Sequence, residues 1–180
     1  MNPIADLVRA WRGLVLILSG DADAGRAFNA SWTGFVIALG WLVLAVLLGA
    51  AVQSMGTGLP RLDQLVAGLL IQAITVAALL WASVIALHFM KSATPALLMF
   101  VVIVYLMALA QLIAIPLGVF GPNAQVIAIL ALVLLIWRSA MVVVPMIAAV
   151  AAAFGLLCLL VLVLVPSALY ILFLQIPAPA

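Results

Sequence analysis

The sequence has 180 residues, of which 71% are hydrophobic and 6% are charged, and its formal net charge is +2. An ordinary soluble protein carries about 25% charged residues, and a water-soluble fold of this composition would lack the polar surface needed to cover its apolar residues. The composition therefore excludes a soluble domain and predicts one all-helical unit solvated by lipid. The small basic excess favours contact with anionic lipid headgroups over nucleic-acid binding.

The chain is predicted to begin with an amphipathic helix. Asn2 and Pro3 form a helix cap followed by a first-turn proline, and Gly20 is a stop signal. Apolar residues recur between them at helical spacing: Ile4, Leu7, Val8, Trp11, Leu14, Val15 and Leu18. The charged residues expected on the opposite face are Asp6, Arg9 and Arg12. The helix either lies along the headgroup layer or docks on the protein's own bundle, and the two arrangements are compatible.

A polar connector from Asp21 to Arg26 follows this helix. We expect it to be solvated and to contain one helical turn capped by Asp21. Residues 1–30 are therefore assigned to a cytoplasmic or interfacial segment, residues 31–176 to a transmembrane bundle, and residues 177–180 to a short tail.

About five spanning helices are predicted, because each needs about 20 apolar residues, and Ser31 is the expected cap of the first. The expected ranges are 33–53, 64–87, 95–115, 124–137 (extending to 144) and a fifth within 142–175. Turn-rich segments separate the first four. Pro145 and Pro166 are each able to break a helix, so four or six spans remain alternatives.

The basic residues predict the orientation of these spans. Five of the six Lys and Arg residues fall on one side: Arg9, Arg12, Arg26, Lys91 and Arg138. Arg61 alone falls on the other side. Because Lys and Arg are retained in the cytoplasm, we expect a cytoplasmic N-terminus. Abundant alanine and the preference for Arg over Lys favour a bacterial inner (plasma) membrane.

Polar residues inside the spans are few: Gln53, Gln72, Thr75, Ser83, Tyr105, Gln111, Gln125 and Ser139. Gln72, Thr75 and Ser83 share one face of the second span and, with Gln111, make up a polar seam. The seam either lines a substrate path or makes interhelical hydrogen bonds, which contribute about 0.6 kcal/mol on average in one membrane system. Because the seam has no ionisable partner, hydrogen bonding is favoured. A hydrated cavity reaching Gln72, Thr75 and Gln111 would instead favour transport.

A second set of residues suits contact with lipids or a partner protein: Arg9, Trp11, Arg12, Trp137 and Arg138. Trp137 and Arg138 end the fourth span, where an aromatic ring anchors at the interface and an arginine reaches the headgroups. Arg138 is also suited to bind a lipid phosphate or a carboxylate, and Asp21 and Asp23 are conceivable partners on the same side.

Enzyme, metal and cofactor signatures are absent from the sequence. HExxH, a usable GxSxG, Walker loops and CxxC pairs are all missing, and the four Asp residues lie outside the spans. His88 is the only histidine, so an interfacial hydrogen bond is favoured over pH sensing or metal binding. Cys158 is the only cysteine, which excludes an intramolecular disulfide. We therefore expect a non-enzymatic protein without a cofactor.

Small residues at four-residue spacing predict close helix contacts. The pairs are Ala45/Gly49, Ala148/Ala152, Ala149/Ala153 and Ala151/Gly155. They serve either the internal bundle or contact with another subunit.

The layout resembles bacterial Yip1-domain proteins. The segments that carry the resemblance are Leu7-Val-Arg-Ala-Trp11, the connector from Gly20 to Phe28, and Leu135-Ile-Trp-Arg-Ser-Ala140. The resemblance covers most of the chain as a pattern and implies a membrane-organising or trafficking-like role without defined chemistry. An accessory subunit of a larger membrane complex is an equivalent expectation. The alternative is a small transporter or permease subunit with a neutral path along Gln72, Thr75 and Gln111.

Overall fold

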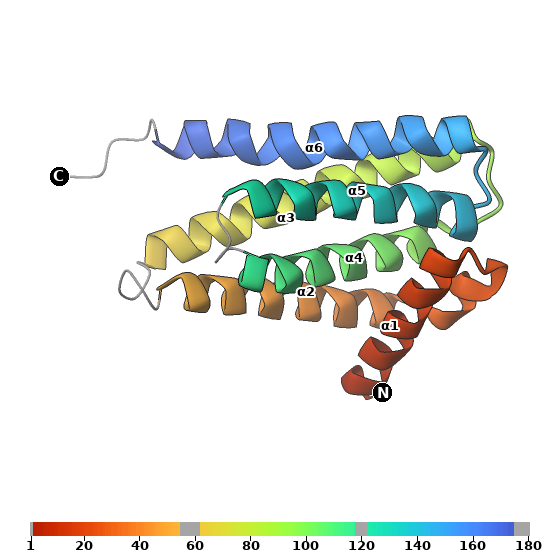
Figure 1. Cartoon of the computed structure of the whole chain (residues 1–180), viewed down its shortest axis with the longest axis horizontal. Coiled ribbons are helices and arrows are strands. Elements are labelled where there is room, and N and C mark those ends of the chain that lie inside the picture. Colours follow the sequence, from red (N-terminus) through yellow and green to blue (C-terminus); the bar gives the residue numbers. More distant parts are fainter. Residues whose placement is uncertain (1, 55–61, 118–121, 175–180) are drawn as a thin grey trace.

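The computed structural model describes residues 2–54, 62–117 and 122–174, and these form a bundle of helices without a strand (Figure 1). The helices are α1 (Pro3–Ser19), the 3-10 helix η1 (Ala22–Ala27), α2 (Trp32–Ser54), α3 (Leu62–Phe89), α4 (Ala96–Leu117), α5 (Pro122–Val143) and α6 (Ala148–Leu174). The five helices α2 to α6 are long and apolar enough to cross a membrane. The predicted all-helical class and the five spans are therefore confirmed, and the chain is a multi-pass membrane protein.

The three predicted caps are present. The Ile4 N–H donates to the Asn2 side chain (3.0 Å) at the start of α1. The Asp23 N–H donates to the Asp21 carboxylate (2.9 Å) at the start of η1, and the Gly34 N–H donates to the Ser31 hydroxyl (3.1 Å) at the start of α2. Each cap satisfies one of the free N–H groups that every helix start carries.

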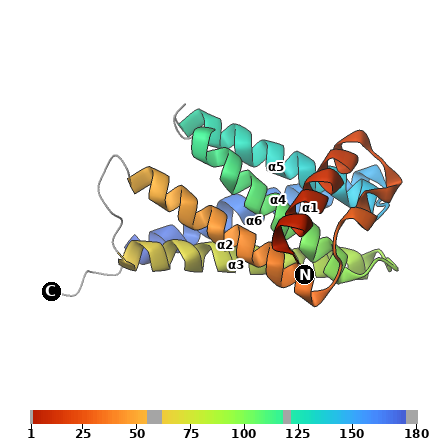
Figure 2. The same ribbon diagram turned by 90° about the horizontal axis from the view of Figure 1, so that it is seen from below.

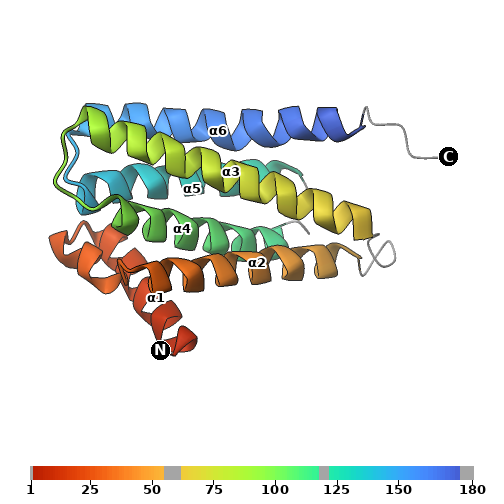
Figure 3. The ribbon, with the colours of Figure 1, turned by 180° about the vertical axis from the view of Figure 1, so that it is seen from behind.

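After α5, a break at residues 144–147 leads into one continuous helix, α6. Pro145 lies in the break, where its missing N–H removes no helical hydrogen bond. Pro166 lies inside α6 without ending it, as is common in spanning helices that neighbours support. Because α6 packs along α3 and α5, as Figure 3 shows for α3, the alternatives of four or six spans are wrong.

The centre of the bundle is α4. Every residue from Val101 to Ala108 is buried, which requires neighbours on all sides of two helical turns. α2, α3 and α5 supply these neighbours. The outward sides of the other spans carry exposed apolar side chains such as Val36, Trp81 and Leu134, which face lipid.

Two of the small-residue pairs serve internal packing. A Cβ on Gly155 would lie 3.3 Å from the Trp137 Cβ, so α5 and α6 approach closely there. Ala45 is buried and a Cβ on Gly49 would contact Ile115 of α4. The other two pairs, Ala148/Ala152 and Ala149/Ala153, are exposed.

α1 crosses one end of the bundle at a steep angle to the spans (Figures 1 and 2). η1 and the connections after α3 and α5 gather at the same end, which we name the α1 end. The residues of this end include five basic side chains: Arg9, Arg12, Arg26, Lys91 and Arg138. Arg61, expected on the other side of the membrane, lies outside the described residues.

The surface of α1 is divided into three faces. Ile4, Val8, Trp11, Val15 and Leu18 form an exposed apolar stripe. Arg9 and Arg12 are exposed on a second face, and a third face is buried on the bundle: Asp6, Ala10, Gly13, Leu14 and Ile17. The helix is thus docked on the bundle, and its exposed apolar stripe remains available for the predicted arrangement along the headgroup layer.

Asp6 is not where the sequence predicted it. Its side chain is 2% exposed, on the docked face and not on the solvated one. At 100° per residue, Asp6 falls between Gly13 and Ile17 of the buried face, about 60° from Arg9. The Arg9 guanidinium pairs with the Asp6 carboxylate, which offsets part of the cost of burying that charge.

Candidate functional site

Arg138 lies half-buried against the C-terminus of α1. Its Nε–H donates to the carbonyl of Ile17 at 3.4 Å, and one of its terminal nitrogens is close enough to clash with a Cβ added to Gly20. The last carbonyls of a helix are free of helical partners, and a cation beside them is stabilising by about 0.3–1 kcal/mol. Arg138 therefore links α5 to the end of α1, which the sequence did not reveal.

The two conceivable carboxylate partners of Arg138 are engaged elsewhere. Asp21 caps η1, and Asp23 pairs with Arg26 at 2.9 Å. Among the described residues, neither carboxylate forms an ion pair with Arg138. That part of the sequence interpretation is corrected, because the cap of η1 engages Asp21 and the ion pair within η1 engages Asp23.

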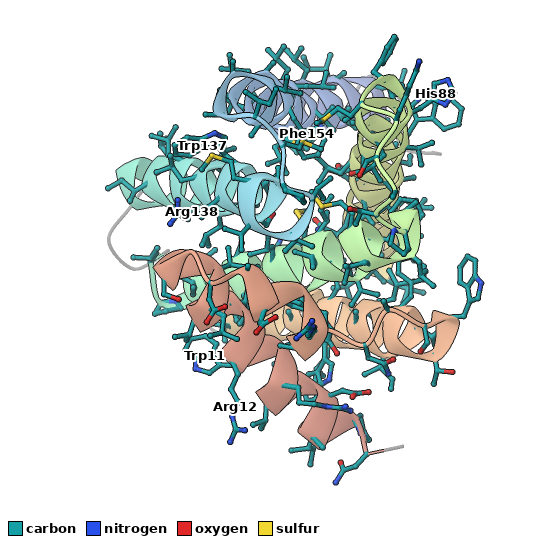
Figure 4. The ribbon with its side chains drawn as sticks, turned by 90° about the vertical axis from the view of Figure 1, so that its right-hand side faces the viewer. Trp11, Arg12, His88, Trp137, Arg138 and Phe154 are labelled. Carbon is teal, nitrogen blue, oxygen red and sulfur yellow. The ribbon has the colours of Figure 1, made fainter. Side chains whose placement is uncertain are left out.

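The other candidate contact residues separate into two groups. Trp11 and Arg12 are exposed on α1 (Figure 4), where an interfacial helix contacts lipid and headgroups. Trp137 is half-buried beside Gly155, and its indole N–H is buried without a hydrogen bond. Trp137 therefore stabilises the α5–α6 contact, whereas a headgroup anchor keeps its N–H in water.

A buried polar group beneath α1 was missed by the sequence interpretation. The Tyr105 hydroxyl of α4 and one carboxylate oxygen of Asp6 are both buried without a hydrogen bond. The Tyr105 ring lies tilted beside the Phe28 ring, with 6.4 Å between the ring centroids. The only sequence signal was a tyrosine near the middle of a span.

The polar seam meets at a half-open cavity between the spans, in the half of the bundle away from the α1 end. Gln72, Thr75 and Gln111 line a cavity of about 360 Å³ that is bounded by all five spanning helices. The Gln111 amide donates to the Gln72 carbonyl at 3.2 Å, and this bond joins α4 to α3. Gln72 lies ten residues after Leu62, about 15 Å from the start of α3, so the pair is well inside the apolar layer.

Hydrogen-bonding groups on the cavity wall are left available. The Gln72 amide nitrogen is buried and has no partner in the described structure. Across the cavity, Pro166 and Leu162 of α6 both line the wall, and Pro166 has no N–H to bond the Leu162 carbonyl. Thr75 donates to the Ile71 carbonyl (2.7 Å) and is satisfied within α3.

Ser83 does not belong to this cavity. It is buried nearer the α1 end, where its hydroxyl donates to the Leu79 carbonyl at 2.8 Å. Bonds of this kind satisfy the hydroxyl within one helix. The predicted seam is thus a cavity wall at Gln72, Thr75 and Gln111 and a closed helix contact at Ser83.

His88 is exposed at the end of α3, where it contacts the Phe89 ring edge-on. It lines a shallow surface depression with Lys91, Ser92 and Thr94. Among the described residues, no group of His, Cys, Asp or Glu is arranged to hold a metal ion.

The cavity wall has amide, hydroxyl and carbonyl groups and no ionisable side chain. It can recognise a molecule through hydrogen bonds and apolar contacts, but it cannot transfer a proton near neutral pH.

Comparison with known proteins does not identify the ligand of this cavity. The sequence matches no protein-family model, no curated protein and no solved structure.

Proposed function

We propose that this multi-pass membrane protein binds a small uncharged molecule in the cavity lined by Gln72, Thr75 and Gln111, as a small transporter or permease subunit. The observation that carries the proposal is the convergence of Gln72, Thr75 and Gln111 on one cavity bounded by five spanning helices. Ligand cavities have volumes of about 300–1,000 Å³ and a few convergent polar groups. The cavity at about 360 Å³ falls within that range.

The chemistry of the ligand follows from the unpartnered groups. The Gln72 amide nitrogen has no partner in the described structure and calls for a hydrogen-bond acceptor. To the Leu162 carbonyl, to which Pro166 offers no N–H, we assign a donor of the ligand. The rest of the wall, including Met107, Ala114 and Leu132, is apolar. A small neutral molecule matches this wall if one of its edges carries a hydrogen-bond donor and an acceptor and the rest of it is apolar. An ion would be bound there without a counter-charge.

The proposal is tested by solute flux into liposomes that contain the purified protein. Stopped-flow light scattering is recorded for urea, acetamide and glycerol against protein-free liposomes. We expect at least one solute to enter faster with the protein present. Gln72→Leu is expected to lower that flux about tenfold, because the ligand loses a buried hydrogen bond, and Ala114→Phe to abolish it by filling the cavity.

Ser83→Ala is the matched control, because Ser83 lies outside the cavity and bonds within its own helix. Its flux is expected to equal that of the unchanged protein. Fluxes at the protein-free level for every solute, unaffected by Gln72→Leu, would contradict the proposal.

A second candidate function is the membrane-organising or accessory role that the Yip1-like layout implies. It is supported by the exposed apolar stripe of α1 and by the outward Ala148 and Ala152. The same experiment discriminates the two functions, because an organising role needs no flux and is insensitive to Ala114→Phe. In either case we propose a non-enzymatic protein of a bacterial inner membrane with its α1 end in the cytoplasm, which the five basic residues of that end favour.

A further inference from the structure

An apolar groove runs between α1, α4 and α5. Its volume is about 380 Å³, and its wall extends from Leu106 to Leu117 on α4 and from Ile127 to Leu135 on α5. Four residues of α1 complete it at the α1 end: Trp11, Leu14, Val15 and Leu18. Every side chain of the wall is aliphatic except that of Trp11.

The shape of the groove suits a hydrocarbon chain. The twelve residues from Leu106 to Leu117 span about 16 Å along α4, so the groove is long and runs along the bundle. The wall is aliphatic along that whole length on α4 and α5, which matches it to an acyl chain.

Arg138 lies where a headgroup would follow such a chain. It comes three residues after Leu135, so the two share one face of α5, and its guanidinium reaches the end of α1 beyond Leu18. In Figure 4, Arg138 and Trp11 lie on the same side of the molecule. The cation is therefore at the α1 end of the groove, the end that meets the membrane surface.

The guanidinium has unused hydrogen-bonding capacity. Only its Nε–H is bonded, to the Ile17 carbonyl, and its two terminal nitrogens have no hydrogen bond in the described structure. The ion pairs of the described residues, Asp6–Arg9 and Asp23–Arg26, do not include it. A phosphate diester accepts two parallel bonds from a guanidinium, so it would supply the missing counter-charge.

We propose that this groove is a binding site for one anionic phospholipid, with an acyl chain between α1, α4 and α5 and its phosphate on Arg138. The site holds α1 against α4 and α5 by filling the space between them. It is independent of the proposed flux function, because it requires neither Gln72 nor Gln111.

The test is native mass spectrometry of the full chain from micelles containing equal amounts of phosphatidylglycerol and phosphatidylcholine. We expect the unchanged protein to retain one lipid, with phosphatidylglycerol preferred. Arg138→Gln is expected to weaken retention of phosphatidylglycerol about tenfold, because charge-assisted hydrogen bonds are lost. Ala131→Trp, which fills the groove without altering any charge, is expected to abolish retention of both lipids.

Two matched controls separate this site from general attraction. Lys91→Gln removes a cation of the α1 end away from the groove, and Ala152→Trp adds the same bulk to an exposed alanine of α6. Both are expected to retain lipid as the unchanged protein does. Equal loss in Lys91→Gln and Arg138→Gln would overturn the proposal, since it would indicate diffuse surface charge.

Two further outcomes decide the matter. Unchanged retention by Ala131→Trp would overturn the groove even if Arg138→Gln failed to fold. Displacement of the lipid by an equal concentration of inorganic phosphate would show that free phosphate is the ligand, and it would overturn the lipid assignment.

Discussion

At the scale of single residues, the junction between α1 and α5 depends on Gly20. Its φ of 81° is in the left-handed region, which costs a residue with a side chain about 1–2 kcal/mol. Its N–H bonds to the carbonyls of Ile17 and Leu16, and the Arg138 guanidinium occupies the space of a Cβ. Glycine therefore both ends α1 and leaves room for the arginine that holds it.

Gly20→Ala is expected to destabilise the docked α1 by about 1–2 kcal/mol, from the positive φ alone, with a further loss from displacing Arg138. Hydrogen exchange of the amides from Leu16 to Asp21 measures the effect in detergent micelles. Gly40→Ala is the control, because a Cβ there meets no atom within 4 Å. Equal exchange in the two variants would contradict this account.

At the scale of elements, α1 shows how one helix serves three environments. The angle of 100° per residue separates the exposed apolar stripe, the charged face and the docked face. Trp41 of α2 adds a bond from its indole N–H to the Pro3 carbonyl (3.4 Å), which fixes the start of the helix as Arg138 fixes its end.

Spin labels on α1 are expected to report these faces. In a Cys158→Ala background, oxygen should increase the relaxation rate of a spin label at Val8→Cys, because oxygen concentrates in lipid and Val8 belongs to the apolar stripe. A water-soluble nickel complex should increase the relaxation rate of a label at Arg12→Cys, because Arg12 lies on the exposed charged face of α1. Ala152→Cys on α6 provides the lipid-facing reference. Identical accessibility at Val8 and Arg12 would mean that α1 does not lie at the membrane surface.

At the scale of the whole molecule, five basic residues lie at the α1 end, whereas the described sides of the spans carry many exposed apolar side chains. Moving such a cluster across a bilayer is costly, since translocon scales assign about 2.5–3.5 kcal/mol to each charge at the membrane centre. The cluster therefore favours one insertion of the bundle over its inverse.

Reporter fusions check this orientation. Fusions after Gly58, Asn123 and Ala180 are expected outside the cytoplasm, and a fusion after Lys91 is expected inside. A cytoplasmic signal after Ala180 would contradict five spans with an N-terminus inside. A reporter fused after Lys91 that is active outside the cytoplasm would contradict the orientation.

Much of the architecture was determined by the sequence. Long apolar runs must form helices in lipid, because no water is present to satisfy a free backbone. Asn2, Asp21 and Ser31 marked helix starts because capping is a local interaction between neighbouring residues. The five spans and the amphipathic character of α1 followed from the same local rules.

The tertiary structure alone decided which sides of these helices meet. The spans are apolar on nearly every side, so periodicity cannot show that α4 is central or that Gln72 faces Gln111. Burial of Asp6 and placement of Arg138 on Ile17 depend on residues distant in sequence. In lipid the apolar faces of a helix have nearly equal affinity for their surroundings, so close packing and a few hydrogen bonds select the arrangement.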